Sequence, residues 1–381
     1  MEIKKLGAEH YDELLEMLNY TFGNSYKRPM DFLSEQPKMW VRDDEHMSRH
    51  IGVFEDGKLC SVVGIYPLKT VIDGEEFLFA TTGNVATLPE YEGRGYFNLI
   101  FNEIMKELDR IGADAARLGG LRQRYGRFGY EMGGTTYKFT FLDHNRKRGF
   151  GENAGEGIVF EEIKPDDNDA LKVCVELSQK RQIHVERTPE NVYPSMCSRY
   201  NKPYAAYLDG KMIGYLAASA SLDNIEEINA FSASDMVNMV CAWQKQKHVC
   251  VNFELPCYMK EEVGAFWSSS NGLKIVPATQ FKIINWQKLL NALMRMKAKS
   301  ERMLDGEFVV EILGYGKLKL FVDGDRVGCE LTDEKAHLIL DRLEATRLLL
   351  GPATPVATAD VATIPRSWLP LPMSWNTLDS I

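Results

Sequence analysis

The sequence predicts a mixed α/β protein made of more than one folding unit, and three observations support this. The chain has 381 residues, which is more than one hydrophobic core usually serves. Segments with apolar residues at helical spacing alternate with shorter, β-rich segments. Asp-Gly pairs separate several of the β-rich segments, as expected for antiparallel hairpins. A hydrophobic content of 45% is that of an ordinary globular protein.

Composition argues against several classes of protein. The net charge of -9 has the wrong sign for general nucleic-acid binding. None of the seven cysteines forms a C-x-x-C pair, and the histidines show no metal-ligand spacing. No apolar run is long enough to span a bilayer, and the N-terminus lacks a signal-peptide core. We expect a cytoplasmic protein with reduced thiols, no metal, and no membrane or nucleic-acid partner.

The first part of the chain predicts helices followed by a β-meander. Residues 8–22 have an amphipathic helical pattern, and a shorter helix interrupted by Pro37 is expected over 28–40. Three strands are expected next, over residues 51–54, 58–70 and 76–86, with Asp-Gly turns between them.

A glycine turn then joins a strand to a helix. Pro89 ends the strand because it has no N–H to donate. Gly93 and Gly95 let the backbone approach a ligand, and the apolar spacing from Phe97 predicts a helix to about residue 111. The unpaired N–H groups and positive dipole of such a helix start suit an anion such as a pyrophosphate. An ordinary strand–helix connection, with glycines only for turning, is the alternative.

The next region weakly repeats the first. A strand over 113–118 and a glycine-rich linker over 149–157 precede it. Residues 207–215 echo residues 53–61, with an Asp-Gly-Lys turn in each. The later segment 231–237 corresponds to the glycine turn but contains no glycine, so it cannot cradle a pyrophosphate in the same way. Chance similarity between two hairpins is the alternative.

A third unit follows. Its pattern predicts a helix over 286–303, a meander and then helical segments over 333–350; the meander strands are expected at 308–313, 317–322 and 326–331. The tail 368–381 holds two tryptophans and ends on an aliphatic residue. Disordered tails are poor in such residues, so we expect this tail to be docked against the body.

Two motifs in the first region resemble those of the GNAT superfamily of N-acetyltransferases. That superfamily's acetyl-CoA motif, Arg/Gln-x-x-Gly-x-Gly/Ala after an apolar strand, is similar to residues 92–97, Glu-Gly-Arg-Gly-Tyr-Phe. The central Gly95 matches, whereas Glu92 and Phe97 depart from the pattern. Residues 125–131, Tyr-Gly-Arg-Phe-Gly-Tyr-Glu, resemble the Phe-Tyr-x-x-x-Gly-Phe signature that follows. Neither dinucleotide-binding nor P-loop glycine spacing is found here.

The whole chain is similar in architecture to the enhanced intracellular survival (Eis) acetyltransferases. This resemblance implies tandem GNAT folds, each a mixed central sheet flanked by helices, followed by an α+β domain similar to a sterol carrier protein. We expect an acetyl-CoA-binding domain at 1–148, a degenerate GNAT-like domain at 149–280 and the sterol-carrier-like domain at 281–381. Members of the family form rings or pairs, so a homo-oligomer is expected.

The resemblance implies direct acetyl transfer from acetyl-CoA to an amine, on a small molecule or a lysine, with no metal. Tyr125 matches the family's general acid, because a phenol of pKa ~10 can protonate a departing thiolate. The family's base is the terminal carboxylate, here that of Ile381. Glu90, Glu92, Glu131 or a chain of waters could serve instead, although each glutamate alone fits a solvated surface charge. The residues expected to bind the co-substrate are Val85, Ala86, Thr87, Gly93, Arg94, Gly95, Tyr96, Phe97, Asn98, Gly120 and Leu121.

Two other functions stay open at this stage. Acyltransferases of another kind, such as N-myristoyl or aminoacyl transferases, also pair two such domains. A lipid- or ligand-binding protein with little or no transferase activity is the second alternative, and the departures at Glu92 and Phe97 leave it open.

Overall fold

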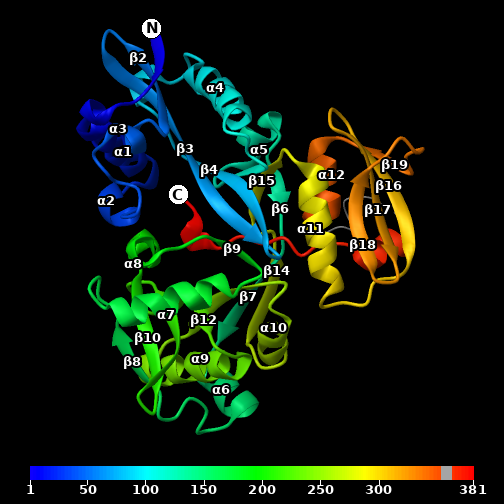
Figure 1. The fold of residues 1–381 in the computed structure, drawn as a ribbon. Helices are drawn as coiled ribbons and strands as arrows, with labels where there is room; N and C mark the ends of the chain where they lie inside the picture. Colours follow the sequence, from blue (N-terminus) through cyan, green and yellow to red (C-terminus); the bar gives the residue numbers. More distant parts are fainter. Residues whose placement is uncertain (353–362) are drawn as a thin grey trace.

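The computed structural model describes residues 1–352 and 363–381 of the chain, which form three lobes (Figure 1). The fold is mixed α/β, with one sheet in each lobe. The first unit contains β1 (Glu2–Lys5), η1 (Ala8–His10), α1 (Tyr11–Tyr26), α2 (Phe32–Glu35), α3 (Asp44–Met47), β2 (His50–Glu55), β3 (Lys58–Ile72), β4 (Glu75–Thr87), η2 (Pro89–Tyr91), α4 (Tyr96–Arg110), β5 (Ala115–Leu118), α5 (Arg122–Tyr125), η3 (Gly126–Phe128) and β6 (Glu131–Gly133).

The predicted meander of the first unit is confirmed. Strands β2, β3 and β4 pair antiparallel in sequence. Asp56 and Asp73 adopt φ of 50° and 54°, and the following Gly57 and Gly74 also have positive φ, as tight hairpin turns require. Helix α4 covers this sheet with an apolar face, on which Ile100, for example, is fully buried. The predicted helix over 28–40 is wrong in length, because only Phe32–Glu35 is helical and an N-cap bond to Asp31 starts it.

Strands β4 and β5 separate along their length. They pair in parallel only from Phe79 with Ala115 to Thr82 with Leu118. Beyond this point β4 continues to Thr87 beside β3 alone, and a register shift occurs there, with Asn84 at φ 51°. One edge of residues 83–87 is therefore open to another chain or ligand.

The second unit has a seven-stranded sheet in the order β14-β7-β13-β12-β11-β10-β8. Its elements are β7 (Thr136–Phe141), α6 (Asp143–Phe150), β8 (Val159–Glu162), α7 (Asn168–Gln179), β9 (Ile183–Val185), α8 (Pro189–Met196), η4 (Ser198–Tyr200), β10 (Lys202–Leu208), β11 (Lys211–Ala218), β12 (Asn224–Ala230), α9 (Ala233–Lys247), β13 (Val251–Pro256), α10 (Lys260–Trp267) and β14 (Gly272–Val276). The β10–β11 hairpin turns at Asp209 and Gly210, both with positive φ, as its counterpart in the first unit does.

Neighbouring sheets exchange strands across the expected domain boundaries. Strand β7 precedes residue 148 but pairs with β13 and β14 of the second sheet. Strand β15 (Thr279–Ile283) lies at the other boundary and pairs with β5 and β6 of the first sheet. The division at 148/149 and 280/281 stays a prediction, and the backbone pairing crosses both positions.

The third unit combines a four-stranded sheet, in the order β18-β17-β16-β19, with helices. Its elements are α11 (Trp286–Ala298), β16 (Gly306–Ile312), β17 (Gly316–Asp323), β18 (Arg326–Leu331), β19 (Leu338–Leu340), α12 (Arg342–Leu350), α14 (Thr363–Trp368) and η5 (Thr377–Asp379). The meander is confirmed, and helix α12 forms within the predicted 333–350. The first part of that range is not helical, because β19 pairs in parallel with β16 before α12 begins. The likeness to a sterol carrier protein stays a prediction.

The C-terminal tail is docked, as predicted. Trp368, Leu371, Met373 and Leu378 are fully buried, and one hydrophobic core joins the tail to the third unit and to β4. In Figure 1 the C-terminus lies between α2 of the first unit and α8 of the second. The tail therefore carries the end of the chain into the space between two units.

No helix in the described ranges is long and apolar enough to cross a membrane.

Candidate active site

The glycine turn before α4 presents a row of free amides. Gly93 and Gly95 adopt φ of 77° and 82°, and Gly95 stands at the N-cap of the helix without a side chain to cap it. Among the described residues, the amides of residues 93 to 97 donate to no backbone or side-chain acceptor. The first turn of α4 holds no acidic residue. These amides and the helix dipole make an anion site.

Side chains on the turn hold its shape. Arg94 donates to Glu55 Oε2 at 2.9 Å and lies 4.8 Å from the ring centre of Tyr91. The Tyr96 hydroxyl donates to the other oxygen of Glu55. Asn98 accepts from Arg127 instead. The arrangement leaves backbone groups, rather than these side chains, free for a ligand.

Phe97 occupies the sixth motif position without closing the turn. Its ring packs against Phe101 at 4.7 Å and Phe128 at 5.9 Å between centroids. The guanidinium groups of Arg124 and Arg127 lie over the same ring at 5.4 and 5.5 Å. Two exposed cations thus stand beside the anion site, a feature that the sequence prediction overlooked although the arginine-rich stretch was visible.

The open edge of β4 forms the other part of the site. Val85, Ala86 and Thr87 lie on this edge, where β5 no longer pairs with β4. Gly120 and Leu121 follow the end of β5 on the opposite side of the split. Gly120 has φ 112° and its carbonyl accepts from Gln280 Nε2 at 2.9 Å, while Leu121 is exposed. An extended ligand could lie in this split and hydrogen-bond to β4 as an added strand.

Tyr125 lies next to this split. A methyl group placed on Gly120 would be 3.2 Å from the Tyr125 ring and 3.7 Å from its hydroxyl. Tyr125 is only 5% exposed. Burial raises the pKa of its phenol, and nearby Arg124 offsets part of that rise. The phenol is therefore protonated at neutral pH and able to donate a proton.

Ile381 is placed beside the same strand. A methyl group on Gly83 would lie 3.0 Å from Ile381 Cγ1, so the last residue of the chain packs directly on β4 where the register shifts. Upstream, the Lys38 ammonium donates to the carbonyl of Leu378. Burial lowers the pKa of Lys38 to about 7, although Asp379 acts to raise it. The chain end thus meets the first unit at the start of the open edge.

Two of the three glutamates named as alternative bases are bound to cations. Glu90 pairs with Lys58 at 2.9 Å, and that hydrogen bond lowers the pKa of its carboxyl. Glu131 is not a surface charge as expected, because it is 2% exposed and pairs with both Arg122 and Arg347. Burial opposes ionisation of Glu131, but hydrogen bonds from Arg122 and from the Met132 amide, with the charges of both arginines, lower its pKa overall. Glu92 is exposed and carries no such pair in the described structure.

A buried polar cluster near the register shift was missed by the sequence analysis. The Tyr66 hydroxyl lies 2.5 Å from His50 Nε2, and Asn84 Nδ2 donates to that hydroxyl at 2.9 Å. All three side chains are at most 5% exposed. Burial lowers the pKa of His50 to about 4, so the imidazole is neutral near pH 7. Nothing in the local sequence signals this cluster, since its members come from three strands.

No group of histidine, cysteine, aspartate or glutamate side chains within residues 1–352 and 363–381 could hold a metal ion.

Comparison with known proteins identifies the class of protein to which the first unit is similar. Residues 2–133 match the family model described as an acetyltransferase (GNAT) domain. This stretch contains the glycine turn, the open edge of β4 and Tyr125. No curated protein sequence matches the chain. The first unit is a GNAT acetyltransferase domain, which makes the protein an acyltransferase.

Solved structures extend the likeness over the whole chain. A probable N-acyltransferase of Enterococcus faecalis has TM-score 0.64 and 18% identity, covering 91% of this chain and 89% of its own. A GCN5-related N-acetyltransferase of Anabaena variabilis has TM-score 0.67 and 14% identity, covering 98% of each chain. Eis1 of Mycobacterium abscessus has TM-score 0.64 and 15% identity, covering 99% of this chain and 98% of its own. The protein thus has an Eis-like fold from end to end.

Proposed function

We propose that the protein is an acetyl-CoA-dependent N-acetyltransferase that transfers the acetyl group directly to an amine. The observation that carries this proposal is the row of unpaired amides at residues 93 to 97, at the end of a strand with an open edge. A diphosphate fits the first feature and an extended amide-containing arm fits the second. Acetyl-CoA supplies an activated acetyl thioester, and it has both of these parts.

The binding residues act mainly through the backbone. The amides of Gly93, Arg94, Gly95, Tyr96 and Phe97 hold the diphosphate. Val85, Ala86 and Thr87 bind the pantetheine arm, and Gly120 and Leu121 line the facing side of the split. A methyl group on Gly93 or Gly95 meets no atom within 4 Å, so these glycines are needed for positive φ rather than for space.

Tyr125 and Ile381 are proposed to move the protons. The acceptor must lose a proton before it attacks, and the terminal carboxylate of Ile381 takes it directly or through a water. Tyr125 gives its proton to the departing sulfur, and its raised phenol pKa keeps that proton in place until the thiolate forms. A main-chain amide of β4 stabilises the negative charge that develops on the acetyl oxygen.

Two measurements test this proposal. Calorimetry with CoA, acetyl-CoA and a long-chain fatty acid tests binding, and we expect heat only with the two CoA compounds. Release of CoA from acetyl-CoA is then followed with a panel of amines, namely a polyamine, an aminoglycoside, a small metabolite amine and a lysine peptide. Binding of the fatty acid without acetyl-CoA would favour the ligand-binding alternative. Binding of acetyl-CoA without turnover on any amine would remove the transferase proposal.

The surroundings of the enzyme stay proposals as well. We infer a cytoplasmic enzyme and a homo-oligomer from the resemblance to the Eis family.

A further inference from the structure

The tail that ends at Ile381 is anchored by a buried ionic network of the second unit. Arg187 Nη1 and Nη2 donate to the two oxygens of Glu227 at 2.7 and 2.8 Å. The same guanidinium donates from Nη2 to Asp379 Oδ1 at 2.8 Å and from Nε at 3.2 Å. Arg187 is 4% exposed, Glu227 2% and Asp379 8%. One arginine thus ties a tail carboxylate to a strand carboxylate inside the protein.

Neutral groups complete the network. The Tyr215 hydroxyl donates to Glu227 Oε1 at 2.5 Å, and Asn376 of the tail donates to Glu227 Oε2. Asn376 Oδ1 also accepts from the amide of Leu378, which starts the short helix η5. Burial would disfavour the Glu227 carboxylate, but Arg187 lowers its pKa to about 2. The pair is therefore charged throughout the neutral range.

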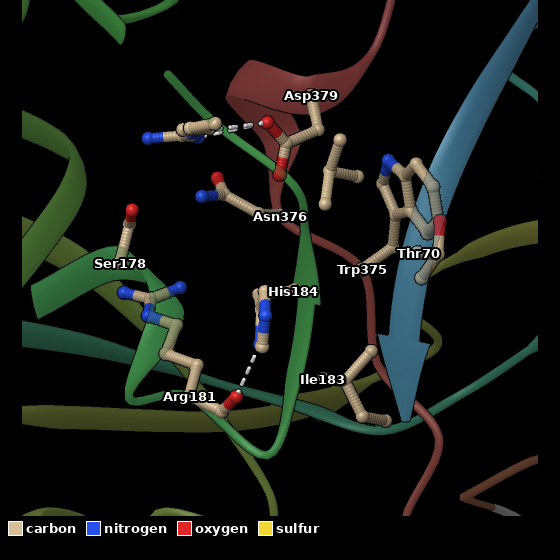
Figure 2. A pocket seen from close by; sticks show the side chains of 10 residues that line it. Thr70, Ser178, Arg181, Ile183, His184, Trp375, Asn376 and Asp379 are labelled. Atoms are coloured by element: carbon tan, nitrogen blue, oxygen red, sulfur yellow. Dashed lines mark hydrogen bonds and ion pairs between the residues drawn. The ribbon is translucent and has the colours of Figure 1, made fainter. Parts of the chain in front are cut away.

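The first unit holds the same tail on the opposite side. Trp375 stacks on Phe79 of β4 with ring centroids 5.5 Å apart, and Ile381 contacts Gly83 of the same strand. Asp379 lies between these two contacts along the chain, and η5 lies against β12 and α8. Figure 2 shows Trp375, Asn376 and Asp379 facing Ser178, Arg181 and His184 across a small pocket. That pocket measures about 10 Å³, which is room for about one water. The tail therefore packs closely against the second unit here, and the pocket is too small for a substrate.

We propose that Arg187, Glu227 and Asp379 are positioning residues that fix the terminal carboxylate of Ile381 at the reaction site. This inference rests on the proposed function, in which that carboxylate is the base. Only Ser380 separates Asp379 from Ile381. Because one residue leaves little conformational freedom, a change in the contacts of Asp379 also moves the carboxylate of Ile381. A displacement by about 1 Å can slow catalysis by about 10²-fold. The second unit thereby serves catalysis without holding the co-substrate.

A double-mutant cycle tests the proposal. Asp379→Asn keeps the size of the side chain but removes its charge, and Asn376→Ala is a milder second variant that leaves the ion pairs intact. We expect Asp379→Asn to lower kcat by about 10-fold to 10²-fold, with the KM for acetyl-CoA unchanged. Deleting Ile381 should lower kcat by about 10²–10⁴-fold. Adding Asp379→Asn to the deletion should cause no further loss, because both changes act through one carboxylate.

Controls separate positioning from general stability. Lys288→Gln breaks a partly buried ion pair with Asp114 (2.9 Å) that includes no residue of the tail, and it should leave kcat unchanged. Carboxypeptidase digestion reports on the tail without any acceptor amine, and Asp379→Asn should speed release of the last residues. Multiplicative losses in the cycle would overturn the proposal, as would unchanged kcat with a freed tail. If the wild-type enzyme turns over no amine, the proposed function fails, and unchanged digestion of Asp379→Asn would then overturn the anchor separately.

Discussion

The first and second units share a hairpin–strand–helix pattern, but their helices α4 and α9 begin in opposite ways. Helix α4 of the first unit starts at Gly95, with no side-chain cap and no acid in its first turn. Helix α9 of the second unit starts at Ser232, whose hydroxyl accepts from the amide of Asp235 at 3.0 Å. Asp235 also places a negative charge in that first turn. The first helix end is left open to an anion, and the second satisfies itself and repels one.

The buried polar clusters of the first and second units also differ in charge. Each half has a buried asparagine that donates to a tyrosine hydroxyl, Asn84 to Tyr66 and Asn229 to Tyr215. The third member of the cluster in the first unit is the neutral His50, and in the second unit it is the ionised Glu227. The charged version holds the chain's tail through Arg187. Helix α9 of the second unit has no open start, but the buried polar cluster of that unit holds the tail of the chain instead.

The largest effect is expected from placing a carboxylate on the glycine turn. Gly95→Glu should abolish acetyl-CoA binding, because it strains a backbone at φ 82° and sets a negative charge among the amides. Titration calorimetry measures this directly. Gly210→Glu is the matched control, since Gly210 has φ 76° and open space around it in the second unit. Equal loss of acetyl-CoA binding in both variants would mean that a strained backbone destabilises the protein, and that the charge on the glycine turn is not the cause.

Tyr125→Phe tests the acid proposed for the first half. We expect kcat to fall by about 10²–10⁴-fold while the acetyl-CoA dissociation constant stays nearly constant, because the role proposed for the hydroxyl is at the leaving sulfur and not in binding. Steady-state kinetics with calorimetry on the same samples separates the two. Wild-type turnover in the variant would exclude Tyr125 as the acid.

The two polar cores should lose stability in different pH ranges. The folded pKa of His50 is about 4, below its ordinary value near 6.5, so the folded state resists protonation that the unfolded chain accepts. Stability from this site is complete above pH 6.5 and falls by about 3 kcal/mol as pH drops to 4. The Glu227 site loses its contribution only between pH 4.5 and about 2. In His50→Gln, the unfolding free energy measured with urea should therefore depend less on pH between pH 7 and 4.5. An unchanged dependence on pH would argue against this role of His50.

The smallest effect concerns the cap of α9. Ser232→Ala should lower the unfolding free energy by about 1 kcal/mol, because the amide of Asp235 loses its acceptor. Acetyl-CoA affinity should not change. Urea unfolding and calorimetry on this variant sharpen the contrast with Gly95, where substitution alters binding first. A weaker acetyl-CoA affinity in Ser232→Ala would mean that α9 takes part in the site.

Much of the fold was predictable because its signals are local. The β2–β3–β4 meander, the start of α4 and the docked tail follow from Asp-Gly turns, helical spacing and buried tryptophans. The exchange of β7 and β15 between sheets was not, since strand pairing across units leaves no mark on either strand. Strand β19 was taken for helix because three residues carry too short a pattern to separate the periods.

The site also has residues that local sequence predicts and residues that it does not. Gly93, Gly95 and Tyr125 lie within one stretch of sequence and were found through motifs. Arg187 and Asp379 are 192 positions apart, and only the folded chain brings them together. The tail was expected to dock, but the groups that hold it depend on long-range packing that no local pattern encodes.

We propose above all that the amides of residues 93 to 97 bind the diphosphate of acetyl-CoA and that the second unit binds none. A crystal structure of the protein with bound CoA tests it most directly. We expect diphosphate oxygens at hydrogen-bond distance from those amides and no CoA at the start of α9. A diphosphate held elsewhere, or a glycine turn left empty at saturating CoA, would contradict it.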